Sequence, residues 1–158
     1  MKRIKKIILI IIAIGVILFL FFKIGDMYAP GSYPYAEEYE LNVDENTLIN
    51  IVNNFKMENP IYLVPEKTQL KDGRRDSSDY WYHIYFYYPE ENQIVKSWIR
   101  QKGKDKVTLA FVGINEGQSL GNWRMINKDF STLENREQKR IFEERILRKV
   151  EERVSSRK

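Results

Sequence analysis

The first pattern along the chain is an unbroken apolar run near its start. Sixteen consecutive uncharged residues, rich in Ile, Leu and Phe, extend from Ile7 to Phe22. As a helix rising about 1.5 Å per residue they span about 24 Å, slightly less than a hydrocarbon core of about 30 Å. Lys23 can place its aliphatic stem along lipid and its ammonium in water, which extends the helix. The sequence therefore predicts a transmembrane anchor over residues 7–25, preceded by a basic segment, residues 1–6.

A cleavable signal peptide is the alternative interpretation of this run, because it also begins with cations and continues with an apolar segment. The run is longer than the roughly 7–15 residues of such a segment, and no small-residue cleavage site follows it. Only Lys23 follows the run closely, whereas four cations precede it: Lys2, Arg3, Lys5 and Lys6. By the positive-inside rule the N-terminus is then cytoplasmic. We expect an uncleaved, single-pass signal-anchor in the cell membrane, with the rest of the chain extracytoplasmic, in the periplasm or at the cell exterior.

A polar segment with helix breakers follows the anchor. Residues 26–43 contain Pro30, Gly31 and Pro34 together with four tyrosines. This composition is typical of an extended linker. The sequence therefore predicts a tether over residues 26–43 and a folded domain over residues 44–158.

Helical periodicity begins at the start of this domain. Asp44 can accept hydrogen bonds from the free N–H groups of a first helical turn. Apolar residues then recur at helical spacing: Leu48, Val52 and Phe55. Asn59-Pro60 ends the helix, because proline disfavours helical geometry in the residue before it. The short apolar run Ile61–Val64 is predicted to be an edge strand.

Four strand-like segments occupy the middle of the domain. Seven of the nine residues of Tyr80–Tyr88 are aromatic, a composition that fits a pleated surface. Short turns or a glycine-containing loop separate the other three segments, Gln93–Gln101, Lys106–Val112 and Asn122–Asn127. Consecutive strands joined in this way predict an antiparallel, four-stranded meander.

The chain ends with an amphipathic helical pattern. Ser131-Thr132-Leu133-Glu134 matches a capping box. The apolar seam that follows consists of Phe142, Ile146, Val150 and Val154. The predicted fold class is therefore α+β, with one helix before the meander and a C-terminal amphipathic helix after it. This order is similar to the cystatin and NTF2-like arrangements, an analogy of topology that implies no function.

Strand alternation divides the predicted sheet into two faces. We pair Tyr88 with Val95 in the first hairpin and Ile99 with Leu109 in the second, which places the cations on one face and the aliphatic residues on the other. The first helix can cover the apolar face, which contains Ile84, Phe86, Val95, Ile99, Val107, Leu109 and Phe111.

The second face combines aromatic rings with cations, beside the small residues Thr108 and Ala110. Its members are the candidate partner-binding residues Trp81, His83, Tyr85, Tyr87, Lys96, Trp98 and Arg100. Rings among cations are typical of a recognition surface. Alternatively, the C-terminal helix lies across this face and leaves the cations at its rim.

Charge and composition narrow the possible functions. The 158 residues have a formal net charge of +4, but five of the 26 cations and none of the acids lie in residues 1–23. The rest of the chain therefore has a net charge of −1, which excludes a histone-like role. The chain has no cysteine, which excludes disulfides and thiol catalysis. Because His83 is its one histidine, we predict no metal site, and we predict no cofactor.

Side chains suited to catalysis are present but poorly spaced. Two serines, Ser77 and Ser78, precede Asp79 and His83. Residues four apart on a strand are separated by about 13 Å, too far for the Asp–His hydrogen bond of a catalytic triad. The loop Gly113–Gly121 lacks the Lys-Ser/Thr ending of a phosphate-binding loop. We therefore predict no catalytic residues and no enzyme activity.

These observations predict a membrane-anchored, non-enzymatic, extracytoplasmic protein-interaction domain. Its partner would be another envelope protein, in envelope assembly, a secretion system or immunity against a toxin. A glycan- or cell-wall-binding module is the alternative, because Trp and Tyr rings can stack on sugar faces. Single-stranded nucleic-acid binding in a DNA-transfer apparatus is a further alternative, against which the net charge of −1 weighs.

Overall fold

The computed structural model describes residue 6 and residues 11–21 and 33–157 of the chain. The chain divides into two compact units, Met1–Pro34 and Tyr35–Lys158.

The first unit contains part of the predicted anchor. Residues 11–21 are helical. Among the residues that the structure describes, no helix is both long enough and apolar enough to cross a bilayer. The remainder of the predicted span, residues 7–10 and 22–25, lies outside the described residues, as does the tether up to residue 32. The membrane anchor therefore stays a prediction.

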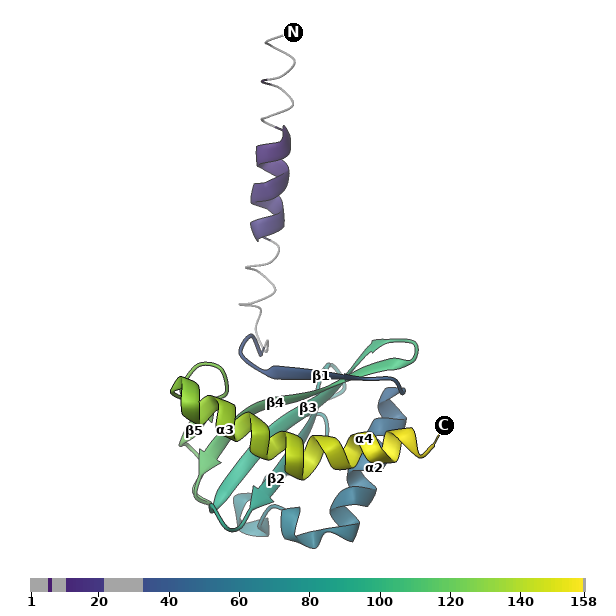
Figure 1. Cartoon of the computed structure of the whole chain (residues 1–158), viewed down its shortest axis with the longest axis vertical. Helices are drawn as coiled ribbons and strands as arrows, with labels where there is room; N and C mark the ends of the chain where they lie inside the picture. The colour runs from purple at the N-terminus through teal and green to yellow at the C-terminus, as the bar shows by residue number, and fades with distance from the viewer. Residues whose placement is uncertain (1–5, 7–10, 22–32, 158) are drawn as a thin grey trace. The chain divides into compact units, whose positions relative to one another are not determined.

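The second unit is α+β, as predicted, and combines an antiparallel sheet with helices (Figure 1). The strands are β1 (Glu37–Leu41), β2 (Tyr82–Tyr88), β3 (Gln93–Gly103), β4 (Lys106–Glu116) and β5 (Trp123–Met125). The helices are α2 (Glu45–Glu58), α3 (Thr132–Phe142) and α4 (Arg148–Ser155), with a π-helical turn (Glu143–Leu147) joining α3 to α4. Two short 3-10 turns, Pro60–Tyr62 and Glu66–Thr68, follow α2.

The strand order in the sheet is β1-β4-β3-β2. Strands β2, β3 and β4 form the predicted antiparallel meander, and β5 pairs with residues 113–115 of β4. Strand β1 pairs with residues 107–111 of β4. The sheet therefore has five strands, and β1 is the strand that the predicted meander lacks. Strands β1 and β5 pair with different parts of β4.

Strand β1 lies within the segment that the sequence predicts as a tether, so the prediction is wrong for these five residues. Tyr39 packs against the core and its hydroxyl donates to Glu143 Oε1 over 3.0 Å, whereas Glu38 and Glu40 are exposed. Burial and the hydrogen bond to Glu143 raise the pKa of Tyr39. The alternation of inward and outward residues is a strand pattern, but it is short and rich in acids, which obscures it in the sequence.

The first hairpin differs from the predicted register by two residues. Tyr88 pairs with Gln93 and not with Val95. Asn92 has a φ of 51°, and this left-handed conformation closes a turn of four residues. Because side chains alternate with a period of two, a shift by two residues leaves every side chain on its predicted face.

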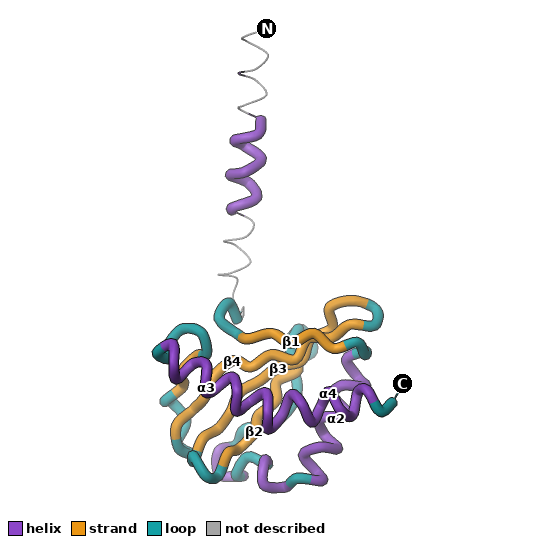
Figure 2. Tube along the Cα trace, in the orientation of Figure 1, coloured by secondary structure: helices purple, strands orange, loops and turns teal. Residues whose placement is uncertain are grey.

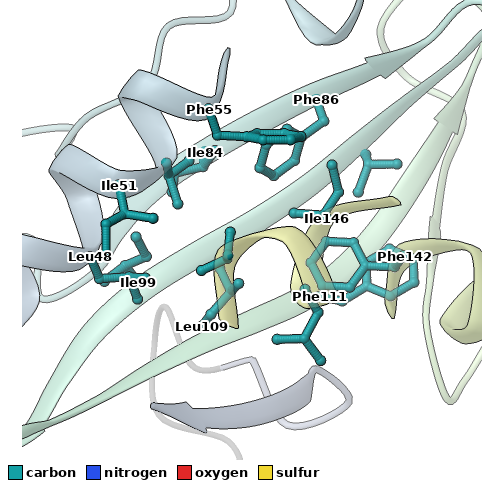
Figure 3. Packing of buried hydrophobic residues seen from close by; sticks show 14 of the residues in the cluster. Leu48, Ile51, Phe55, Ile84, Phe86, Ile99, Leu109, Phe111, Phe142 and Ile146 are labelled. Carbon is teal, nitrogen blue, oxygen red and sulfur yellow. The ribbon is translucent and has the colours of Figure 1, made fainter. Parts of the chain in front are cut away.

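The second hairpin has the predicted register, with Ile99 opposite Leu109. All seven residues predicted for the apolar face are buried, with exposed fractions of 0–1%: Ile84, Phe86, Val95, Ile99, Val107, Leu109 and Phe111. Helix α2 covers them with Leu48, Ile51 and Phe55, as Figure 3 shows. The prediction of the hydrophobic core is confirmed.

The C-terminal helix lies on this same core face, so the alternative that places it across the second face is wrong. The ring of Phe142 stacks on Phe111 with centroids 4.7 Å apart, and Arg153 of α4 forms an ion pair with Glu58 of α2 at 2.7 Å. Figure 2 shows α3 and α4 continuing one another across the strands. Burial of one large apolar side chain contributes about 1.5–3 kcal/mol, which favours packing of the seam against aliphatic residues over packing against polar-tipped rings.

The segment Ile61–Val64 is not an edge strand. Pro60 begins a 3-10 turn that ends at Tyr62, because the fixed φ of proline suits the first position of a helical turn. The turn directs Tyr62 onto Phe55, with ring centroids 5.3 Å apart, and onto Tyr88 at 6.0 Å. Tyr62 thus packs against the core without joining the sheet, whereas Ile61 and Leu63 are exposed.

The loop before β2 closes the edge of that strand. The backbones of Gly73 and His83 exchange two hydrogen bonds of 2.9 Å, and Asp72 Oδ1 accepts a third from Tyr85 N at 2.9 Å. Buried Lys56 of α2 forms an ion pair with Asp72 Oδ2 and donates to Tyr85 O over 2.8 Å. The loop is thereby fixed to the core, and it positions the residues that enter β2.

Candidate binding surface

The face of the sheet opposite the helices, called the outer face below, carries the predicted site residues. The pairs that meet across its strands are His83 with Trp98, Tyr85 with Lys96, and Arg100 with Thr108. Trp81 lies just before β2 and contacts the ring of Trp98. The structure thus brings six of the seven predicted residues together, and Tyr87 lies apart from them.

Arg100 lies against two aromatic rings. Its Cζ is 5.7 Å from the ring centroid of Trp81 and 6.0 Å from that of Tyr80. Trp81 in turn meets Tyr80 and Trp98 edge-on, with centroids 6.1 and 6.5 Å apart. Trp98 is buried, whereas Arg100 is exposed and Tyr80 is 71% exposed. These four residues, called the Arg100 stack below, extend from the sheet to solvent. The rings of Tyr80 and Trp81 hold the guanidinium of Arg100 through cation–π attraction.

Trp123 joins the outer face from β5. Its ring centroid is 6.4 Å from that of Tyr85 and 5.9 Å from Lys96 Nζ. Gly113 permits this close approach of β5, because a Cβ there would lie 2.4 Å from the carbonyl oxygen of Arg124. The sequence predicted a strand for Trp123 but assigned it to neither face of the sheet. The chain has three tryptophans, and the assignment of Trp81 and Trp98 to the outer face was the one indication that Trp123 lies there too.

Tyr87 belongs to a separate hydrogen-bonded group. Its hydroxyl donates to Asn92 Oδ1 over 3.0 Å and accepts from Gln118 Nε2 over 2.7 Å. Asn92 and Gln118 also line a separate hollow of about 640 Å³. Tyr87 therefore occupies the predicted face but not the Arg100 stack.

His83 and Asp79 are hydrogen-bonded, contrary to the sequence-based distance argument. His83 Nε2 lies 3.0 Å from Asp79 Oδ2. Asp79 precedes β2, which begins at Tyr82, so the spacing of an extended strand does not apply to this pair. The Asp79 carboxylate also accepts hydrogen bonds from the backbone N–H groups of Trp81 (3.1 Å) and Arg75 (3.2 Å), which hold the chain in a bend.

Burial dominates the electrostatics of the outer face. It lowers the pKa of His83 despite the opposing hydrogen bond to Asp79. It also lowers the pKa of Lys96, with a smaller contribution from Arg75, and raises the pKa of Tyr85. Burial alone would raise the pKa of Asp79, but its hydrogen bonds outweigh this and lower it. His83 is therefore neutral near pH 7 and donates to a charged Asp79.

The hydrogen bonds at this site do not form the relay of a serine nucleophile. In such a relay the serine hydroxyl donates to the imidazole, whereas the hydroxyl of Ser78 donates to Asp76 Oδ1 over 2.5 Å. Within residues 6, 11–21 and 33–157, no three side chains of His, Asp or Glu are close enough together to hold a metal ion. What the outer face offers is rings, a guanidinium and polar groups, which suit binding.

Two hollows adjoin the Arg100 stack. The larger, about 550 Å³, lies between the start of α2, the loop before β2 and the end of β3, and Arg74, Asp79, Tyr80 and Arg100 are among the residues that line it. The smaller, about 210 Å³, is lined by Trp98 and Arg100 together with Glu38 of β1 and others. Arg100 and Gln101 line both hollows. The larger hollow is called the Arg100 cleft below.

No protein-family model, curated protein or solved structure matches the chain.

Proposed function

We propose that the protein is a non-enzymatic binding domain, tethered to the cell membrane by residues 7–25, which binds another envelope protein through its outer face. The observation that carries this proposal is the Arg100 stack, which combines Trp, Tyr and Arg on the sheet face opposite α2, α3 and α4. These three residue types dominate the binding energy of protein interfaces. Trp98 is buried in the sheet, whereas Arg100 and Tyr80 are exposed and accessible to a partner.

The proposed location rests on the sequence. The apolar run, Ile7 to Phe22, and the four cations before it support an anchor with a cytoplasmic N-terminus. In this orientation the second unit lies outside the cytoplasm, in the periplasm or at the cell exterior. Partners within reach would include components of envelope assembly or secretion, or a toxin that an immunity protein neutralises.

Site-specific photocrosslinking in cells of the native host tests the binding surface. A photoreactive phenylalanine replaces Tyr80 in the full chain, and the matched control carries it at Leu133 of α3. Both side chains are similarly exposed, 71% and 76%, but Leu133 belongs to the C-terminal helix. We expect a discrete protein adduct, identifiable by mass spectrometry, from position 80 and not from position 133.

Four outcomes contradict the proposal. Adducts of equal yield from both positions indicate unspecific proximity, and no protein adduct from position 80 removes the outer face as a protein-binding surface. The location is tested separately by carbonate extraction of membranes and by protease digestion of spheroplasts. Release of the full chain by carbonate, or protection of the second unit from protease, overturns the proposed anchor and orientation.

Glycan binding is the second candidate function. The exposed ring of Tyr80 lies beside a cleft whose lining includes the polar side chains of Glu45, Arg74 and Gln101. A stacking ring next to hydrogen-bonding groups suits a sugar face. An adduct from position 80 that muramidase digestion removes would favour this function over protein binding. The net charge of −1 outside residues 1–23 disfavours a nucleic acid.

A further inference from the structure

Arg100 differs from the other arginines that lie over rings. Arg100, Arg124, Arg145 and Arg153 each lie over an aromatic ring. Each of the last three also has a carboxylate within 4 Å, from glutamates of neighbouring elements. Arg100 lies over the rings of Tyr80 and Trp81, and no carboxylate of the described residues lies within 4 Å of it. Its guanidinium is therefore positioned while its N–H groups have no acidic acceptor among the described residues.

The acids that line the Arg100 cleft already have partners. Glu45 forms an ion pair with Arg74 at 2.5 Å, and Arg74 also donates to Asp79 O over 2.8 Å. The carboxylate of Asp79 accepts from His83 and from backbone N–H groups. Even the first backbone N–H of α2, that of Glu45, donates to Gln101 Oε1 over 2.6 Å. Arg100 is thus the charged group of this cleft that is left to bind an ion of opposite charge.

We propose that the Arg100 cleft binds an acidic side chain of the partner protein, with its carboxylate on Arg100 and a neighbouring aromatic residue against Tyr80. This inference rests on the proposed function and specifies the chemistry of the partner. A guanidinium presents parallel N–H groups that match the two oxygens of a carboxylate. Contact with two rings restricts the guanidinium before binding, which reduces the entropy lost on binding.

The cleft favours a carboxylate over a phosphate. Glu45 and Asp79 also line it, and their charges would repel a dianion more strongly than a monoanion. Its volume of about 550 Å³ is within the range of small-ligand pockets and accommodates an acidic side chain with its neighbour.

Nuclear magnetic resonance on the full chain in phosphatidylcholine nanodiscs tests this inference. The probes are two dipeptides, N-acetyl-Tyr-Glu-amide and the isosteric N-acetyl-Tyr-Gln-amide, and the signals are the Trp81 indole N–H and the Arg100 Nε–H. We expect the Glu dipeptide to bind about tenfold more tightly or better, as for a charge-assisted hydrogen bond. Arg100→Gln should abolish this preference, whereas Arg136→Gln on exposed helix α3 should retain it.

The outcomes separate the inference from the proposed function. Equal binding of the two dipeptides, or a preference that persists in Arg100→Gln, overturns the inference. Tighter binding of N-acetyl-phosphotyrosine amide than of the Glu dipeptide also overturns it, in favour of a phosphate. A protein adduct from position 80 would still support the proposed function in each of these cases, and its absence would remove that function whatever the dipeptides show.

Discussion

The two faces of the sheet differ in the polarity of the side chains that they present. The core face presents Ile84, Ile99 and Leu109, which have no polar atoms in their side chains and are fully buried beneath the helices. The outer face presents side chains of similar or larger size, but Trp98 and Arg100 carry N–H groups at their tips. Both faces use alternate residues of the same strands, so one alternation specifies a packed interior on one side and a polar-tipped surface on the other.

This difference shows why truncation should affect the faces unequally. A core side chain contributes through burial and close packing, which are lost together when it is shortened. An exposed side chain at the rim of the outer face contributes little to folding and remains available for binding. Stability and binding should therefore be separable by mutation in this protein.

The largest effect is expected for Phe111→Ala on the core face. Its ring stacks on Phe142 and is 1% exposed, so its removal leaves a cavity that should cost about 3–5 kcal/mol of unfolding free energy. Urea unfolding of the full chain in detergent, followed by circular dichroism, measures this. Tyr80→Ala is the matched outer-face variant and should change stability by less than about 0.5 kcal/mol. Similar losses in the two variants would contradict the comparison.

A smaller effect is expected for Gly113→Ala, which perturbs the outer face through the backbone. The new Cβ would collide with the Arg124 carbonyl, so β5 must move away from β4 at a cost of about 1–3 kcal/mol. Trp123 should then lose its contacts with Tyr85 and Lys96, which a shift of its indole N–H resonance would report. Gly103→Ala is the control, because a Cβ there meets nothing within 4 Å. An unchanged Trp123 resonance would show that β5 does not depend on Gly113.

The smallest effect is expected from the titration of His83. Its folded-state pKa lies below the ordinary 6.5, chiefly because of burial. As the pH falls through 6.5 the unfolded chain binds a proton that the folded chain does not, so stability decreases until the pH passes the folded pKa. The unfolding free energy should therefore fall more between pH 7.5 and pH 5.5 in the unmodified protein than in His83→Gln. If the unfolding free energy decreases equally in the unmodified protein and in His83→Gln, groups other than His83 cause the pH dependence.

The sequence predicted the sheet faces better than the pairings within the sheet. Side-chain alternation depends only on local periodicity, which is why all seven core residues were correct even though the first hairpin is shifted by two. The register itself depends on the conformation of Asn92, and nothing in the hydrophobic pattern specifies it. Strand β1 was missed because its pairing with β4 connects residues about 70 positions apart in the chain.

The candidate site was predicted in part for the same reason. Six residues of the outer face followed from alternation. Tyr80 did not, because alternation along the predicted strand places it opposite Trp81, whereas β2 begins only at Tyr82, and the strand of Trp123 was not included in the predicted register. The bond between His83 and Asp79 was excluded on the assumption that both lie on one strand, whereas Asp79 lies in the bend before β2. Contacts made by bends and by distant strands depend on the complete fold, which a local pattern does not contain.

The closed edge of β2 has a consequence for crowding. This strand consists of seven mostly aromatic residues, and its unpaired N–H and C=O groups would otherwise offer a template for a strand from another molecule. At His83 and Tyr85 these groups are bound by the backbone of Gly73, the carboxylate of Asp72 and the buried ammonium of Lys56. A strand from a neighbouring molecule therefore cannot add to the sheet along these two residues.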